Sequence, residues 1–465
     1  MASVSGKTFA DLDPSTGRKF VEVAEGGAED VDAACKAAAK AATGPWRKFS
    51  PRERARLLHE TARLVRDNVQ QLAELESQDT GKPIGGARGE IGFVADVFDY
   101  YAGAVSRHFG ETIPVGNAGI ELTLKEPVGV CGLIVPWNFP LVLASWKLAP
   151  ALACGNTVVL KPAAESPLTA LRLGELMAEA GIPEGVVNVV PGPGPGCGDE
   201  LVKHPLVRKV SFTGSTKTGT AVMKSAADGI KKVSLELGGK SANVVFDDVA
   251  DLDACVEKSL WSVFDNAGQD CCARSRALVH HKIYDKYVEK FVARAKSVVL
   301  GTPHEKGVEM GPLISENQRR RVSVYAEAGV EEGCERLCGG TAPKRDGFFF
   351  EPTVLAGATA KMRVFQEEIF GPVVTMTPFK TEEEAIALAN DSAYGLSGTI
   401  WTTNSGRAIR VARAVQSGVI SVNSASSVYL EAPFGGYKAS GIGRELGMKA
   451  MDLYSETKSV FFSEL

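Results

Sequence analysis

Three side chains that lie far apart in the sequence have the chemistry to act together on one carbonyl carbon: Cys271, Asn138 and Glu236. A cysteine thiolate can attack such a carbon, a side-chain amide can donate a hydrogen bond to the oxyanion that forms, and a carboxylate can activate the water that releases the acyl group. Taken singly, each has a structural alternative, because a lone cysteine is more often a small apolar residue in a core. Together they predict covalent catalysis on a carbonyl compound.

Two of these residues follow apolar runs that are predicted to be strands. Asn138 stands in the segment PWNFP, just after the run Val130–Val135, and Glu236 ends the run Lys232–Leu235. A carboxylate at the end of an apolar strand is expected to have a raised pKa and to act as a base, with a buried salt bridge as the alternative. The asparagine between two prolines is either a preorganised hydrogen-bond donor or part of a structural turn.

Apolar strand runs alternate with helical segments along most of the chain, which is typical of parallel sheets covered by helices. In the first series the predicted strands are Val130–Val135, Thr157–Lys161, Val187–Val190, Lys209–Phe212 and Lys232–Leu235, and the helices are 140–153, 167–180 and 217–227. The strands of the second series are Ala242–Phe246, Ala277–His280, Val373–Phe379, Gly398–Trp401 and Gly418–Val422. The predicted fold class is therefore α/β with two sheets.

The segment before these series has helical and hairpin patterns. Apolar residues recur at helical spacing over 51–79 and again over 86–107. Residues 111–127 alternate between apolar and polar side chains around a Gly-rich turn at 116–119, which predicts a β-hairpin. A hairpin cannot bury its apolar face alone, so we expect this one, with the tail 457–463, to pair between subunits of a homodimer or homotetramer.

The composition is that of a globular protein with more than one domain. The chain has 465 residues, 44% of them hydrophobic and 23% charged, and its 52 basic and 56 acidic residues give a net charge of −4. The absence of a basic excess argues against nucleic acid as a partner, and no apolar run is long enough to predict a membrane span. Nine cysteines without an export signal indicate reduced thiols and a cytoplasmic protein.

From about residue 10 to the C-terminus, the chain resembles the aldehyde dehydrogenase superfamily, in its NAD(P)-dependent, non-acylating branch. The segments that carry the resemblance are PWNFP at 136–140, FTGSTKTG at 212–219, LELGGK at 235–240, GQDC at 268–271, EEIFGPV at 367–373 and the C-terminal stretch 433–445. The resemblance implies a Rossmann-like cofactor domain (1–108 and 128–239), a second α/β catalytic domain (240–439) and a small β oligomerisation arm (109–127 and 440–465).

The same resemblance assigns roles to individual residues. Cys271 is the nucleophile, Glu236 the general base, and Asn138 stabilises the oxyanion together with the backbone amide of Cys271. The expected cofactor-binding residues are Trp137, Lys161, Ala164, Gly214, Ser215, Leu237, Glu368 and Phe370.

The residue at position 164 departs from a pattern of the family. Many relatives that prefer NAD carry a glutamate three residues after the equivalent of Lys161, where this chain has Ala164 followed by Glu165. We therefore expect the enzyme to use NAD and also NADP.

The substrate is expected to be an uncharged aliphatic or aromatic aldehyde. By analogy, the tunnel residues are Phe93, Phe139, Leu143, Trp146, Trp261 and Asp265, together with the loop 424–432. This set is mostly apolar, and the loop contains no Lys or Arg that could bind a carboxylate. An aminoaldehyde or betaine aldehyde is the alternative substrate, because Asp265, Asp270 and Glu431 add negative charge.

Two other functions would fit the same fold. An enzyme that transfers the acyl group to CoA is disfavoured by Glu236, which such relatives generally lack, and an inactive structural relative is disfavoured by the complete set of three catalytic residues.

We expect no catalytic metal, since adjacent residues on a strand, such as His280 and His281, point to opposite faces. Cys272 is a candidate for a redox role beside Cys271.

Overall fold

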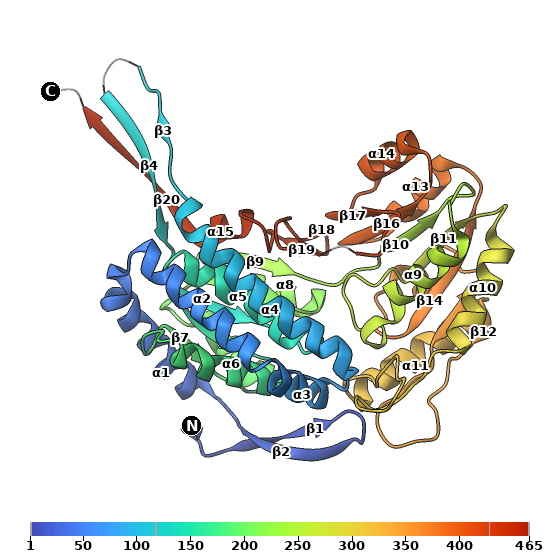
Figure 1. The fold of residues 1–465 in the computed structure, drawn as a ribbon, viewed down its shortest axis with the longest axis horizontal. Coiled ribbons are helices and arrows are strands. Elements are labelled where there is room, and N and C mark those ends of the chain that lie inside the picture. Colours follow the sequence, from blue (N-terminus) through green and yellow to red (C-terminus); the bar gives the residue numbers. More distant parts are fainter. Residues whose placement is uncertain (1, 117–118, 427, 464–465) are drawn as a thin grey trace.

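The structure is a computed structural model, and it describes residues 2–116, 119–426 and 428–463. Two sheets, each with its own helices, lie side by side, and a narrow three-stranded arm extends from the first of them (Figure 1). The helices and strands of the N-terminal half pack around the first sheet, and those of residues 242–422 form the second (Figure 1). The predicted α/β class is confirmed.

The first sheet has six strands in the order β19-β9-β8-β5-β6-β7. Their bounds are β5 Val130–Ile134, β6 Thr157–Lys161, β7 Val187–Val189, β8 Val207–Thr213, β9 Lys232–Glu236 and β19 Gly441–Ile442. All neighbours are parallel except β19, which pairs antiparallel with β9. The five predicted strands of this series are confirmed to within two residues at each end.

Helices cover both faces of this sheet because successive side chains of a fully buried strand enter different cores. On β5, Cys131 and Leu133 join the core beneath α5 (Pro140–Ala153) and α6 (Leu168–Glu179). Val130 and Ile134 of the same strand join the core of the opposite face. The elements of that face are α1 (Ala28–Thr43), α7 (Asp199–Lys203) and α8 (Thr216–Ala227).

The continuous helix predicted over 51–79 is wrong, because the structure has two helices there. These are α2 (Pro51–Asp67) and α3 (Val69–Thr80), and they are separated at Asn68, whose ψ of 17° departs from helical geometry. The Asn68 side chain donates to the Leu64 carbonyl at 2.8 Å, and the same carbonyl also accepts from the Asn68 backbone amide at 3.1 Å. The second predicted helix corresponds to α4 (Ile84–Ala104), followed by the 3-10 turn η2 (Val105–Arg107).

The second sheet has seven strands in the order β12-β13-β14-β11-β10-β16-β17. Their bounds are β10 Ala242–Val245, β11 Arg276–His280, β12 Glu335–Cys338, β13 Thr353–Ala356, β14 Val373–Phe379, β16 Ser397–Trp401 and β17 Val419–Val422. Only β12 pairs antiparallel. The helices of this part are α9 Leu252–Phe264, α10 Tyr284–Lys296, α11 Glu316–Glu331, α12 Arg363–Gln366, α13 Glu382–Asn390 and α14 Ser405–Ala414.

The arm consists of β3 (Thr112–Ile113), β4 (Gly119–Pro127) and β20 (Ser455–Ser463) in the order β20-β4-β3. The predicted hairpin 111–127 is confirmed in its strands, while residues 117–118 of its turn lie outside the described residues. The tail pairs with β4 of the same chain along its whole length. The expectation of pairing between subunits concerns a second chain and stays a prediction.

The remaining elements are short. They are β1 Thr8–Asp13, β2 Arg18–Ala24, η1 Pro45–Lys48, η3 Gly194–Gly198, η4 Asp265–Gly268, β15 Tyr394–Gly395, β18 Tyr437–Lys438 and α15 Lys449–Leu453. The Gly/Pro-rich segment after β7 is thus partly a helical turn, η3. None of the helices in the described part of the chain is long and apolar enough to cross a membrane.

Candidate active site

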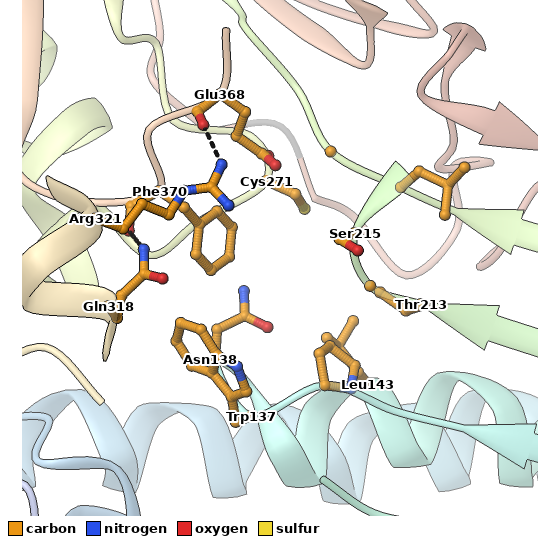
Figure 2. A pocket seen from close by; sticks show the side chains of 14 residues that line it. Trp137, Asn138, Leu143, Thr213, Ser215, Cys271, Gln318, Arg321, Glu368 and Phe370 are labelled. Atoms are coloured by element: carbon orange, nitrogen blue, oxygen red, sulfur yellow. Dashed lines mark hydrogen bonds between the residues drawn. The ribbon is translucent and has the colours of Figure 1, made fainter. Parts of the chain in front are cut away.

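A cavity of about 210 Å³ lies between the two sheets and brings together most of the predicted site residues. We call it the central cavity; its lining is Pro136, Trp137, Asn138, Leu143, Thr213, Gly214, Ser215, Leu237, Gly238, Cys271, Gln318, Arg321, Glu368 and Phe370. Figure 2 shows Asn138 and Cys271 facing this space, with Ser215 and Thr213 on one side and Glu368 and Phe370 on the other. Glu236, Lys161 and Ala164 are not among the lining residues.

The loop that carries Cys271 has a strained backbone. Asn266 and Ala267 have φ values of 49° and 55°, in the left-handed region that costs energy for residues other than glycine. Gly268 continues this conformation at φ 71°, and a Cβ there would come within 2.2 Å of the Gly371 carbonyl. Such strain persists only where the surroundings fix it, so the loop holds Cys271 in one defined position.

Neighbouring residues fix the two sides of this loop. The Gln269 side chain accepts from the Ile314 amide at 2.9 Å and donates to the Asn266 carbonyl at 3.1 Å. On the other side, Gly239 lets the loop approach, because a Cβ at Gly239 would lie 2.2 Å from the Cys271 carbonyl. A glycine in the segment 235–240 is therefore a steric requirement of the cysteine loop.

The Cys271 thiol is half-buried, and its surroundings favour the protonated form. Its hydrogen bond with Cys272 and its burial raise the pKa of Cys271 well above the usual value, and the negative charge of Asp270 adds to the effect. A thiol must lose its proton to become a nucleophile. The geometry therefore requires a base for the attack.

Asn138 is held at both its backbone and its side chain. Its Nδ2 donates to the Gln269 carbonyl at 2.9 Å, and its own carbonyl accepts from Asn266 Nδ2 at 2.8 Å and from Lys82 Nζ at 3.1 Å. The amide nitrogen points into the central cavity (Figure 2), and the residue is only 3% exposed. One amide hydrogen is used on Gln269, which leaves the second for a negatively charged oxygen beside Cys271.

Glu236 is the last residue of β9 and is buried. Burial and the negative charge of Glu445 raise its pKa well above the usual value, and Lys147 opposes this shift. Its Oε2 has no hydrogen-bond partner among the described residues. Lys147 and Glu445 form a buried ion pair beside it. A buried carboxyl group with a raised pKa and a free oxygen binds a proton more readily than an exposed one, as a general base must.

One wall of the central cavity is the start of α8. Ser215 is the N-cap residue of this helix, and its hydroxyl accepts from the Thr218 amide at 3.2 Å. A helix N-terminus presents free backbone amides and a positive dipole, which suit an anion such as a phosphate. Gly214 and Leu237 line the cavity beside it.

The opposite wall is the segment 367–373. Glu368 accepts from the Gly239 amide at 2.9 Å, and a Cβ at Gly238 would come within 2.5 Å of the Glu368 carboxylate. Phe370, with φ 61°, packs edge-on against Trp137 with 5.3 Å between ring centroids. These contacts bring two of the predicted cofactor residues to the cavity from the second sheet and one from the first.

Lys161 and Ala164 lie apart from the central cavity, at the end of β6. Lys161 is buried, and its Nζ donates to the Pro162 carbonyl at 2.8 Å. Burial lowers the pKa of Lys161, while Cys197 and Glu165 oppose the shift. Ala164 is half-buried and Glu165 is exposed.

Two residues of the central cavity are absent from the sequence-based predictions. Gln318 and Arg321 lie one turn apart on α11 and reach the segment 367–373, where Gln318 donates to the Phe370 carbonyl at 2.6 Å and Arg321 to the Glu368 carbonyl at 2.7 Å (Figure 2). The only sequence signal is the basic run at 319–321, which by itself is typical of an exposed helix face.

The predicted tunnel residues do not all reach the central cavity. Leu143 lines the central cavity, while Phe93, Phe139 and Trp146 contribute to the core around α4 and α5. Trp261 packs against the core of the second sheet, with the Arg294 guanidinium over its ring.

Asp265 begins η4, the turn that leads to Cys271. It is exposed to solvent, yet the surrounding protein and Asp270 raise its pKa. Residue 427 of the loop 424–432 lies outside the described residues.

Arg274 is buried, and its guanidinium donates to the Thr399 hydroxyl at 3.2 Å and to the Cys272 carbonyl at 3.1 Å. The expectation that His280 and His281 point to opposite faces is wrong, because the strand ends at His280 and the two rings lie 4.7 Å apart.

One group of side chains that could hold a metal ion lies in the loop that carries the candidate nucleophile. Within the described ranges, the one such group is Asp270, Cys271 and Cys272. The absence of a catalytic metal stays a prediction. All nine cysteines are free thiols.

Comparison with known proteins gives one consistent result. The family model described as "Aldehyde dehydrogenase family" matches residues 1–460. The betaine aldehyde dehydrogenase of Bacillus subtilis is 44% identical over 457 residues, covering 97% of this chain and 93% of that protein. The mitochondrial aldehyde dehydrogenase of Homo sapiens is 45% identical, with 98% and 89% covered. The NAD+ complex of an aldehyde dehydrogenase from Bacillus cereus superposes with a TM-score of 0.98 at 44% identity, covering 100% and 94%.

Proposed function

The chain belongs to the aldehyde dehydrogenase family and is an aldehyde dehydrogenase enzyme, and from this premise we propose that it oxidises an aldehyde to the carboxylic acid through a covalent intermediate on Cys271. The observation that carries the proposal is the placement of Cys271 and the Asn138 amide on one cavity, with the buried Glu236 at the end of β9, two strands from β5 in the same sheet. This arrangement supports the roles that the resemblance indicates for the three residues.

The first step is attack by Cys271. A water molecule takes the proton of the thiol, the sulfur bonds to the aldehyde carbon, and the carbonyl oxygen becomes an oxyanion. The free hydrogen of the Asn138 amide and the backbone amide of Cys271 stabilise this oxygen. Asn138 is buried and fixed by Gln269 and Asn266, so little reorganisation is needed when the charge forms.

The residues around the central cavity fit a nicotinamide dinucleotide. Ser215 and the α8 N-terminus suit the pyrophosphate, Glu368 suits ribose hydroxyls, and the Trp137–Phe370 pair offers an aromatic surface. Gln318 and Arg321 hold the Glu368–Phe370 segment in place. A bound nicotinamide would supply the acceptor for the hydride of the aldehyde carbon, and loss of that hydride would convert the Cys271 adduct to a thioester.

The last step is hydrolysis of the thioester. Glu236 takes a proton from water, and the resulting hydroxide releases the carboxylic acid and the Cys271 thiolate. Its carboxylate lacks a partner in the described residues, so it is available to a water molecule. The same residue argues against CoA as the acyl acceptor, because a base for water is needed only when water is the nucleophile.

We propose that both NAD and NADP serve as cofactor. NAD is supported by the NAD+ complexes of the Bacillus cereus enzyme and of a Staphylococcus aureus betaine aldehyde dehydrogenase, the latter with a TM-score of 0.97 at 40% identity and with 99% of this chain and 92% of that chain covered. For NADP the support is Ala164, which is too small to repel a 2′-phosphate, beside the cationic Lys161.

An uncharged aliphatic or aromatic aldehyde is the proposed substrate, since the predicted tunnel residues Leu143, Phe139 and Trp146 are apolar and Leu143 lines the central cavity with Cys271. A cationic aminoaldehyde or betaine aldehyde is the second candidate. It is favoured by Asp265, an exposed carboxylate at the start of η4, the turn that leads to Cys271. The name of the Bacillus subtilis relative also favours it.

We also propose that the subunits associate through the arm, as a homodimer or homotetramer. The arm sheet is formed within one chain, and it leaves Ile120, Phe461 and Phe462 more than half exposed, at 55%, 51% and 55%. Apolar side chains on a narrow extended sheet are suited to a protein interface. The division into a cofactor domain, a catalytic domain and an oligomerisation element, with the bounds given above, belongs to the same proposal.

The experiment that tests the proposed function is aldehyde-dependent NADH formation by wild type, Cys271→Ala and Cys272→Ala, with and without CoA. Cys271→Ala should abolish oxidation while NAD still binds, and Cys272→Ala is the matched control that keeps the nucleophile. If Cys271→Ala kept even about a tenth of the wild-type rate, the nucleophile would be another residue. A requirement for CoA would refute hydrolysis by Glu236.

A further inference from the structure

Lys82 is a buried lysine that lies next to the candidate oxyanion donor. It follows α3 and precedes α4, and it is 3% exposed. Its Nζ donates to Glu90 at 2.5 Å and to the Asn138 backbone carbonyl at 3.1 Å, and it lies 4.7 Å from the centre of the Phe139 ring. The ammonium group therefore contacts the PWNFP segment at two consecutive residues.

Two glutamates balance the charge of Lys82. Glu90 comes from α4, and Glu76, from α3, has its carboxylate 3.9 Å from Nζ. Glu76 is fixed in turn by the Thr169 hydroxyl at 2.6 Å. A buried ion pair of this kind is weak as a source of stability, because the desolvation of its members offsets their attraction. Its directed hydrogen bonds are better suited to fixing a geometry.

The Asn138 carbonyl is the point where this cluster meets the cysteine loop. It accepts one hydrogen bond from Lys82 and one from Asn266, which lies in the strained turn before Cys271. The Asn138 side chain then donates to Gln269, two residues from Cys271. Lys82 thus fixes the backbone from which the amide extends, and the cysteine loop fixes the end of the amide.

We propose that Lys82 is a positioning residue for the oxyanion donor: its ammonium group holds the Asn138 carbonyl so that the side-chain amide faces Cys271. The inference rests on the proposed role of Asn138 and adds a residue that does not itself touch the reacting atoms. Loss of the Lys82 hydrogen bond leaves the Asn138 carbonyl with one contact, from Asn266, and lets the segment 136–140 rotate. A displacement of about 1 Å in such a group costs up to ~100-fold in rate.

The proposal predicts that loss of Lys82 affects two reactions of Cys271 differently. Hydrolysis of an ester such as p-nitrophenyl acetate passes through an oxyanion, whereas alkylation by iodoacetamide is a displacement at carbon that forms none. Lys82→Met, which keeps the length of the side chain and removes its charge, should slow ester hydrolysis by about 10- to 100-fold. Alkylation of Cys271 should stay within about twofold of wild type, because the nucleophile itself is unchanged.

Lys209→Met is the matched control. Lys209 is also a buried lysine with one hydrogen bond, to Ser234 at 2.9 Å, and it lies 4.9 Å from the centre of the Tyr454 ring. It has no contact with the PWNFP segment among those described. Its loss should lower thermal stability as much as that of Lys82, without changing the ratio of ester hydrolysis to alkylation. If Lys82→Met lowered both reactions in parallel, or lowered neither, the positioning role would be refuted.

A double-mutant cycle with Asn138→Ala decides whether Lys82 acts through Asn138. If it does, Lys82→Met should slow ester hydrolysis little further once the amide is gone. Losses that multiply in full would show that Lys82 acts by another route. An Asn138→Ala enzyme with the wild-type ester rate would instead refute the oxyanion role in the proposed function, whatever Lys82 does.

A second variant covers the case in which Lys82→Met fails to fold. Glu90→Gln keeps a hydrogen-bond acceptor for Lys82 but removes the charge that holds it, so it should give the same selective loss at a smaller size, about threefold. Equal effects on hydrolysis and alkylation in this variant would overturn the proposal.

Discussion

Replacing Glu236 by glutamine should divide the reaction into a fast first turnover and a slow steady state. Glutamine has the shape of glutamate, and Glu236 is 4% exposed, so packing at the end of β9 is preserved. Glutamine cannot take a proton from water, however, and the loss of a positioned base costs about 10²- to 10⁴-fold. Hydride transfer precedes this step, so one NADH per active site should still form at close to the wild-type rate.

The raised pKa of Glu236 also predicts how the steady-state rate depends on pH. Burial and Glu445 raise the pKa of Glu236, so the group is protonated and inactive at low pH and gains activity as the pH rises. The steady-state rate of wild type should therefore rise with pH through this transition, and that rise should be absent in Glu236→Gln. A raised pKa also means that the folded state holds this proton more tightly than the unfolded state. The stability it contributes is thus present below pH 4.5 and is lost as the pH rises, in wild type but not in the variant.

Stopped-flow measurement of NADH, with active sites counted by titration, tests this prediction. Asp79→Asn is the control, since Asp79 is another buried carboxyl group whose pKa is raised well above normal, and it lies outside the central cavity. The control should keep the wild-type steady state. An unchanged steady state in Glu236→Gln, or a burst slowed as much as turnover, would show that Glu236 is not the base for deacylation.

Three further predictions concern assembly, substrate and cofactor. Light scattering at micromolar concentration should show a dimer or tetramer, because Ile120, Phe461 and Phe462 are exposed on the arm, and a monomer would contradict this. Hexanal or benzaldehyde should exceed succinic semialdehyde in kcat/KM, since a carboxylate near Asp265 would lack a cation; the reverse order would mean that the tunnel is assigned wrongly. Wild type should accept NADP, and Ala164→Glu should raise selectivity for NAD by ~1–2 kcal/mol, whereas thousandfold rejection of NADP by wild type would refute the argument from Ala164.

Five strands of each sheet could be predicted from the sequence, most clearly those that are buried on both faces, whereas β12, β13 and β19 are missing from the prediction. A strand such as β6 is apolar along almost its whole length and is bounded by turn residues, which gives a clear pattern. The break between α2 and α3 could not be predicted, since the apolar spacing continues through Asn68 and the interruption is confined to the backbone of that one residue. Helical periodicity shows which face of a helix is buried, but it does not show where the helix is interrupted.

The meeting of the candidate nucleophile Cys271 with Asn138 at one cavity could be predicted because their segments have distinctive residues in a fixed order. Gln318, Arg321 and Lys82 could not, because their contacts depend on how α11 and the α3–α4 connection pack against other segments. Lys82 shows the difficulty most clearly. In the sequence it lies in a Gly-Lys-Pro turn, where a lysine is normally solvated, and only the fold encloses it with Glu76 and Glu90.

The central claim, a covalent acyl intermediate on Cys271, is tested most directly by mass spectrometry of the Glu236→Gln enzyme. The variant is mixed with NAD and hexanal, quenched in acid after the burst, digested, and the peptide that contains Cys271 and Cys272 is fragmented. The account predicts that this peptide carries the mass of one hexanoyl group, located on Cys271. An acyl group on Cys272, or a burst of NADH without any acylated peptide, would contradict it.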